Sequence, residues 1–139
     1  MSSYLVFSLR EKESGKFRDV TAYISSSDQY QTVYDALNVP YNGEDNDTDP
    51  AKRLRLTKER VDTIKRYIKE EREGYERSLD AYRQTNNPSW DLFTTAQDYI
   101  KFLENLKYID IWCDALANIV YDIDNSESFY EGLYIHIDN

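Results

Sequence analysis

The chain has 139 residues, a net charge of −9 and a single cysteine. This length suits one domain over residues 1–139, with enough buried surface to fold without disulfides. Because Cys113 has no second cysteine to pair with, we expect a reducing, cytoplasmic compartment. A negative charge repels polyanions, and no run of eighteen apolar residues occurs. We therefore expect neither direct nucleic-acid binding nor a membrane-bound protein.

The negative charge is concentrated in the second part of the chain. Residues 86–139 hold ten acidic residues and two lysines, a net −8, whereas residues 1–85 carry only −1. The chain also has 13 tyrosines, a residue type enriched in the centres of protein interfaces. Acidic side chains mixed with aromatic ones predict a surface that contacts a partner with a basic surface.

Alternating patterns predict strands at both ends of the chain. Residues 4–10 and 17–24 each alternate between apolar and polar side chains, and a turn at Ser14 and Gly15 separates them. The first 24 residues therefore predict a β-hairpin. Leu133, Ile135 and Ile137 alternate with polar residues and predict a C-terminal strand that can pair beside the hairpin.

Two helices are predicted in the middle of the chain. Residues 26–29 resemble a capping box, with Ser26 and Gln29 exchanging hydrogen bonds, and predict a short helix that ends before Pro40. Residues 41–50 are then an acidic loop. Thr57 is a plausible N-cap for a long helix over residues 57–85, whose apolar residues share one narrow stripe.

A third helical region starts after Pro88 and is more apolar than the second. Its first half has one apolar stripe and its second half another, and at 100° per residue the stripe turns by roughly 100° near residues 107–110. Either the helix kinks or splits there, or it is a continuous central helix that buries two faces.

The order of these elements predicts an α+β fold. In it, a small antiparallel sheet, made of the N-terminal hairpin and the C-terminal strand, is covered on one face by long antiparallel helices. The main alternative is a helical bundle decorated by a hairpin.

Candidate metal and catalytic groups are sparse. Residues 45–49 place acids at alternating positions, as a calcium loop does, but Pro50 and Leu56 stand where such a loop needs glycine and glutamate. Asp110 and Asp114 lie one helical turn apart. They are either a carboxylate pair for acid–base or metal chemistry, or two solvated side chains.

The remaining signs of catalysis are weaker still. His136 is the only histidine, and we expect it to be exposed on the last strand. No serine or cysteine lies in a recognisable nucleophile motif, and one cysteine with one histidine cannot form a zinc site. Cys113 is expected to be a small core residue. We therefore expect no enzyme, no cofactor and no metal.

Basic residues gather in residues 52–83, with eleven Lys and Arg against seven acids. The acids are interleaved with them, a pattern typical of ion pairs within a helix rather than of a nucleic-acid-binding stripe. This helix can also lie against the acidic second half, within one chain or between two copies.

The most suggestive segment is 121–138, which has no Lys or Arg. Carboxylates on a rigid frame can occupy a cationic groove built for phosphates, while aromatic side chains supply contact area. The candidate partner-binding residues are Tyr121, Asp122, Asp124, Glu127, Tyr130, Glu131, Tyr134 and Asp138. The alternative is an acidic surface that only aids solubility.

These features favour a non-catalytic protein–protein interaction module. One specific form is an inhibitor or nucleic-acid mimic that acts on a basic, nucleic-acid-handling protein, as a viral accessory protein can. The first alternative is a homo-oligomeric assembly protein, and the second is a carboxylate-based enzyme or metal-binding protein.

Overall fold

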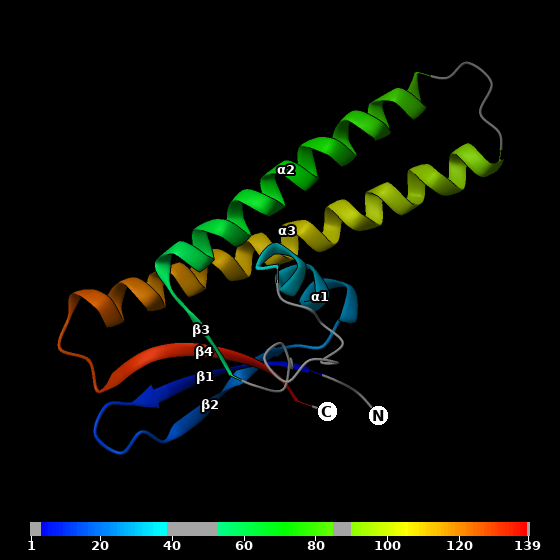
Figure 1. Cartoon of the computed structure of the whole chain (residues 1–139). Coiled ribbons are helices and arrows are strands. Elements are labelled where there is room, and N and C mark those ends of the chain that lie inside the picture. The colour runs from blue at the N-terminus through cyan, green and yellow to red at the C-terminus, as the bar shows by residue number, and fades with distance from the viewer. Residues whose placement is uncertain (1–3, 39–52, 85–89, 139) are drawn as a thin grey trace.

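A computed structural model describes residues 4–38, 53–84 and 90–138 of the chain. Within them the element order is β1 (Tyr4–Glu11), β2 (Phe17–Ile24), α1 (Ser27–Ala36), β3 (Leu54–Leu56), α2 (Lys58–Arg83), α3 (Trp90–Asn125) and β4 (Tyr130–Asp138). The sheet lies on one side of the molecule and the long helices cross over one of its faces (Figure 1). The predicted α+β class is confirmed.

The described strands form one four-stranded antiparallel sheet in the order β2-β1-β4-β3. The predicted hairpin is present, and its turn contains Gly15 at φ +69°, a backbone conformation that glycine adopts without strain. β4 pairs along β1 from Tyr4 opposite Asp138 to Glu11 opposite Tyr130, as the predicted pairing of the C-terminal strand requires.

β3 was not expected from the sequence. The sequence patterns predict no strand before the long helix, but Leu54 to Leu56 pair with β4 as an edge strand. A strand of three residues is too short to show an alternating pattern, so only its pairing partner reveals it.

The core lies between the sheet and the helices. Leu5 and Phe7 from β1 and Ile135 from β4 point toward α2 and α3, and the Phe7 ring stacks on Trp112 with centroids 4.9 Å apart. The helices contribute Val61, Ile64 and Ile68 from α2 and Leu106, Ile109, Cys113, Leu116 and Val120 from α3. The apolar stripe predicted for residues 57–85 thus packs against the sheet and against α3 of the same chain.

α3 is one continuous helix, which resolves the alternative left open by its rotating stripe. At about 1.5 Å per residue, its 36 residues span roughly 54 Å. Its first half runs beside α2 beyond the sheet, where the two helices form an arm (Figure 1). Tyr99 of α3 packs there against Tyr75 and Tyr82 of α2. The second half of α3 turns a different stripe toward the sheet, so the helix buries two faces.

The expected capping box at α1 is absent, although the helix starts where predicted. Ser26 is the N-cap but its side chain makes no capping hydrogen bond, and Gln29 donates to Asn105 Oδ1 of α3 at 3.3 Å instead. A tertiary partner has replaced the local one. Thr57, in contrast, caps α2 as predicted and accepts from the Arg60 backbone N–H at 3.2 Å.

None of the helices in the described part of the chain is long and apolar enough to cross a membrane.

Candidate functional site

The last turns of α3 and the loop after them carry the first group of predicted partner-binding residues. Tyr121 is 66% exposed, and Asp122, Asp124 and Glu127 are exposed beside it. Phe129, which the sequence interpretation did not include, is 57% exposed at the end of the same loop. We call these five residues the α3 tip. They lie at the end of the molecule opposite the helical arm (Figure 1).

The carboxylates of the α3 tip are not neutralised. None of Asp122, Asp124 and Glu127 forms an ion pair with a Lys or Arg among the described residues. The side chains of Asn125 and Ser126 donate hydrogen bonds to the backbone carbonyls of Tyr121 and Asp122. These bonds end the helix and present the acids on a fixed frame.

Two cavities flank the α3 tip. One, of about 270 Å³, lies between the first turns of α2 and the last turns of α3 and is lined by Tyr121, Asp124, Val61 and Ala117, among others. The other, of about 370 Å³, lies between α2, α3 and β4 and again includes Asp124. Lys58 lines both cavities and Arg55 lines the second, so their walls carry basic as well as acidic side chains. The tip therefore combines exposed aromatic rings and free carboxylates with concave surface.

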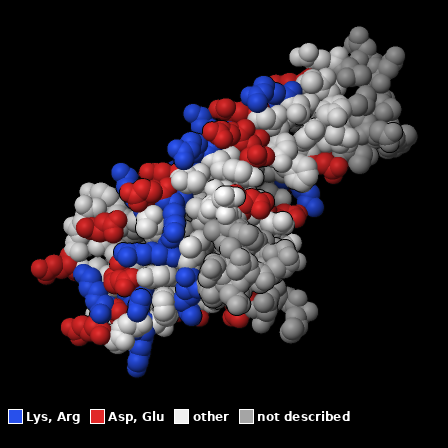
Figure 2. Space-filling view, in the orientation of Figure 1, with Lys and Arg blue, Asp and Glu red and all other residues white. Residues whose placement is uncertain are grey.

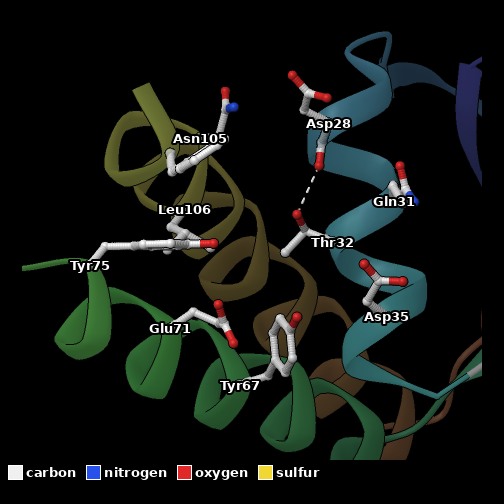
Figure 3. A pocket seen from close by; sticks show the side chains of 10 residues that line it. Asp28, Gln31, Thr32, Asp35, Tyr67, Glu71, Tyr75, Asn105 and Leu106 are labelled. Atoms are coloured by element: carbon white, nitrogen blue, oxygen red, sulfur yellow. Dashed lines mark hydrogen bonds between the residues drawn. The ribbon is translucent and has the colours of Figure 1, made fainter. Parts of the chain in front are cut away.

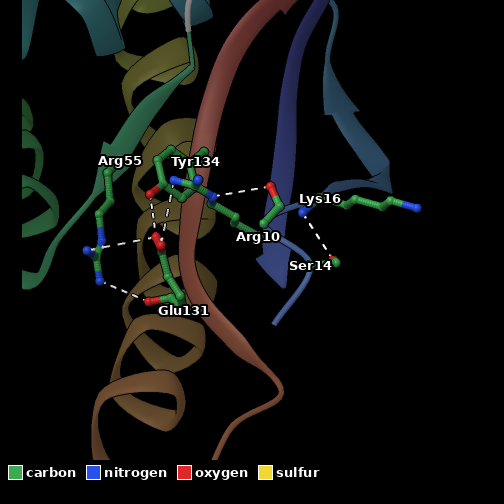
Figure 4. A network of polar contacts seen from close by, with 7 residues as sticks. Arg10, Ser14, Lys16, Arg55, Glu131 and Tyr134 are labelled. Carbon is green, nitrogen blue, oxygen red and sulfur yellow. Dashed lines mark hydrogen bonds and ion pairs between the residues drawn. The ribbon is translucent and has the colours of Figure 1, made fainter. Parts of the chain in front are cut away.

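Glu131 and Tyr134 belong to a different environment, a polar network on the sheet face that the helices leave uncovered (Figure 4). Glu131 lies 3.7 Å from Arg10 and 3.9 Å from Arg55, and it accepts a hydrogen bond from the Tyr134 hydroxyl. Burial and this contact with Glu131 raise the pKa of Tyr134. Here the acid is already paired, so it is not free for a partner.

Tyr130 and Asp138 mark the two ends of β4, roughly 25 Å apart at the rise of an extended strand. Tyr130 contacts Phe129 with ring centroids 5.2 Å apart and so borders the α3 tip, whereas Asp138 lies beyond reach of it. The eight candidate residues of the segment 121–138 therefore lie in separate places rather than on one continuous surface. In the view of Figure 2, acidic and basic side chains are mixed at the end of the molecule opposite the helical arm.

Asp110 and Asp114 differ in their surroundings, since Asp110 is half-buried. Asp114 is exposed and forms an ion pair with Lys65 of α2, which raises the pKa of the lysine. Cys113 between them is 1% exposed, and burial raises the pKa of its thiol to about 12. Asp114 thus joins α3 to α2, and the Cys113 thiol is an inert core group, as expected.

His136 is buried, which corrects the expectation of an exposed strand histidine. Only 8% of it is accessible, its Nδ1 has no hydrogen-bond partner among the described residues, and burial lowers its pKa. Nearby, the Ser8 hydroxyl donates to Asp19 Oδ1 at 2.7 Å, and Asp19 lies 3.5 Å from Arg53. Those contacts lower the pKa of Asp19, so it is a weak base toward Ser8.

No group of three potential metal ligands occurs within residues 4–38, 53–84 and 90–138. The alternating acids at 45–49 fall outside these ranges.

The sequence interpretation missed a groove between α1, α2 and α3. Its charged lining residues are Asp28 and Asp35 on α1 and Glu71 on α2. Asp28 and Asp35 are seven residues apart and so share one helix face, and α1 contains no Lys or Arg. The seven-residue spacing of the two aspartates is the only sign of the groove in the sequence. The contribution of Glu71 depends on the packing of α2 beside α1, which the sequence pattern does not reveal.

Comparison with models of known protein families, with curated proteins and with solved structures found no match.

Proposed function

We propose that this protein is a non-catalytic protein–protein interaction module, and that the α3 tip binds a basic surface of its partner. The observation that carries the proposal is the exposure of Tyr121 and Phe129 among three carboxylates without ion-pair partners in the described chain. Exposed aromatic side chains next to concave surface are typical of binding hot spots.

The two kinds of side chain have different roles in this proposal. The carboxylates attract and orient a positively charged partner, which mainly accelerates association. The tyrosine and phenylalanine rings supply the area that leaves water on binding, which mainly slows dissociation. In the specific form of an inhibitor or nucleic-acid mimic, the carboxylates occupy phosphate positions in a cationic groove.

The test is selection from a displayed library of random peptides, because such a library offers every kind of basic sequence without a choice of one partner. The full chain is expected to enrich Lys- and Arg-rich peptides, with binding at least tenfold weaker in 0.5 M salt than in 0.05 M salt because ions screen the contact. Replacing Asp122, Asp124 and Glu127 with lysine is expected to abolish this binding.

The matched control reverses three exposed acids on α2, Glu70, Glu73 and Glu76, which lie away from the tip, and changes the net charge by the same amount. Loss of binding in the tip variant alone supports the proposal. Equal loss in both variants indicates a general charge effect, and retention in the tip variant shows that the tip is not the contact surface. Either result contradicts the proposal.

Self-assembly is a second candidate, favoured by an apolar stripe on α3. Tyr108, Ile111, Ala115 and Ile119 are exposed at helical spacing, and Ile111 is 61% accessible. On α2, in contrast, Ile64 and Ile68 of the apolar stripe are buried in the core and cannot contact a second copy.

Sedimentation velocity over a hundredfold concentration range tests this candidate. A dimer held by the stripe is expected to dissociate in an Ile111→Glu and Ile119→Glu variant but not in a Tyr23→Glu control, since Tyr23 is an exposed residue on β2. High salt should preserve such an apolar dimer while it weakens binding at the α3 tip. A monomer at all concentrations excludes the stripe as a dimer contact.

A further inference from the structure

The groove between α1, α2 and α3 is a second concave surface, separate from the α3 tip. Its volume is about 270 Å³, and all three helices supply its walls. Figure 3 shows Asp28, Asp35 and Glu71 around its opening, with Tyr67 and Tyr75 projecting from α2. Pockets that enclose whole small molecules measure about 300–1,000 Å³, so this one suits a single long side chain.

The charge of the groove has one sign. Three carboxylates line it, no Lys or Arg does, and none of the three forms an ion pair with a described residue. The one hydrogen bond drawn in Figure 3 runs from the Thr32 hydroxyl to the backbone carbonyl of Asp28 and does not involve its carboxylate. Glu71 accepts a hydrogen bond from the Tyr75 hydroxyl. The groove therefore presents hydrogen-bond acceptors to whatever enters it.

The tyrosines on its floor respond to this negative potential. Burial raises the pKa of Tyr67 and Tyr75, and the neighbouring carboxylate of Glu71 raises both further. Asp35 acts on Tyr67 in the same direction. A potential that disfavours a second negative charge at these rings favours a positive charge in the same space.

Aromatic walls determine which cation fits best. The Tyr75 and Phe102 rings lie 5.3 Å apart at 33°, and Phe102 is exposed. A guanidinium group is planar, stacks on aromatic faces and presents a fork of donors to carboxylates, whereas an ammonium group is compact and more strongly hydrated. The combination of acids and rings thus selects arginine over lysine.

We propose that the groove receives the guanidinium group of an arginine side chain from a protein partner. The proposal deepens the proposed function and rests on it for the class of partner. In the bound state the Asp28, Asp35 and Glu71 carboxylates accept the guanidinium N–H groups, and the guanidinium plane stacks on the free face of the Tyr75 or the Phe102 ring. The α3 tip and the groove then recognise two separate basic features of one partner.

The experiment is a titration of the full ¹⁵N-labelled chain, followed by NMR, with acetyl-Gly-Arg-Gly-amide. The same peptide with lysine or norleucine in place of arginine, and free agmatine, are titrated in parallel. We expect the arginine peptide to shift amides of α1 and of residues 67–75. The lysine peptide should bind at least threefold more weakly, and the norleucine peptide should not bind.

The test variant combines Asp28→Asn, Asp35→Asn and Glu71→Gln, which remove charge but keep shape. It is expected to weaken binding of the arginine peptide at least tenfold. The matched control, Glu13→Gln, Glu70→Gln and Glu73→Gln, removes the same charge from exposed positions outside the groove and should bind as the original chain does. Should the test variant fail to fold, the shift map of the original chain still decides whether the groove is occupied.

Several results would overturn the inference. These are shifts located outside the groove, equal binding of the lysine or norleucine peptide, undiminished binding to the test variant, or binding of free agmatine without binding of the peptide. The last result would indicate a small-molecule cation instead. A chain with Asp122, Asp124 and Glu127 changed to lysine should still show the groove shifts, so failure of the proposed function and failure of this inference remain distinguishable.

Discussion

At the scale of single residues, Ser8 and His136 are the buried polar side chains of the described part of the chain. Ser8 donates its hydroxyl proton to Asp19, whereas the Nδ1 of His136 has no partner among the described residues. Burial disfavours protonation of such an imidazole, because the charge would be poorly solvated. The consequence is a dependence of stability on pH.

We expect the free energy of unfolding to fall as the pH drops through 6.5. Burial, assisted by Arg53, lowers the folded-state pKa of His136 from 6.5, although Asp19 and Asp138 oppose this shift. The unfolded chain therefore binds the proton first, and stability that is complete above pH 6.5 is lost below it. Urea unfolding between pH 5 and 7.5 measures the effect.

A His136→Gln variant provides the control, because it removes the titrating group while keeping a polar side chain. Its stability should be nearly constant from pH 7.5 to pH 5. A slope as steep as that of the original chain would assign the pH dependence to other groups. The pKa of Asp19 is also lowered, but its effect on stability falls below the usual value of 3.8 and therefore outside this pH range.

At the scale of elements, α1 and α2 start at similar sequence signals but only one of them uses a side-chain cap. Thr57 accepts a hydrogen bond from the backbone of Arg60, whereas Ser26 makes none. Both N-caps have extended backbone angles. At α1 the backbone N–H of Gln29, which a capping serine hydroxyl would bind, donates to the Ser26 backbone carbonyl at 3.1 Å instead.

This difference predicts unequal costs for the two cap substitutions. Thr57→Ala should lower the free energy of unfolding by about 1 kcal/mol, because an amide of the first turn loses its acceptor. Ser26→Ala should change it by less than about 0.5 kcal/mol, a change usual for surface substitutions. Denaturant unfolding of both variants at pH 7 measures them, and equal costs would mean that Ser26 caps α1 in solution.

At the scale of the whole molecule, one core joins the sheet to both long helices. Ile135 lies at its centre, is 0% exposed and belongs to β4, the strand between β1 and β3. Because its neighbours come from distant parts of the chain, loosening this point should affect helices and sheet together.

Ile135→Val is expected to cost about 0.5–1.5 kcal/mol, the usual range for removing one buried methylene group. Circular dichroism, which follows the helices, and tryptophan fluorescence should report the same shift in the urea midpoint. Ile111→Val, at an exposed position on α3, should leave the midpoint unchanged. If circular dichroism and fluorescence gave different urea midpoints, the arm would unfold independently of the sheet.

Local features of this protein could be predicted from its amino-acid sequence: the hairpin, the C-terminal strand, the start of both middle helices and the α+β class. Alternation and helical periodicity are properties of neighbouring residues, so they can be recognised without knowing what packs against them. The continuity of α3 was one of two interpretations, because a rotating stripe is compatible both with a break and with two buried faces.

Which charges and rings are available to a partner depends instead on how the elements pack. Glu131 is paired because β1 and β3 bring Arg10 and Arg55 to it, His136 is buried, and the groove exists because α1 lies beside α2 and α3. Each of these depends on contacts between residues distant in sequence, and such contacts leave no periodic signal. For that reason the acidic segment 121–138 could be recognised from the sequence, whereas its division into a free tip and a paired strand could not.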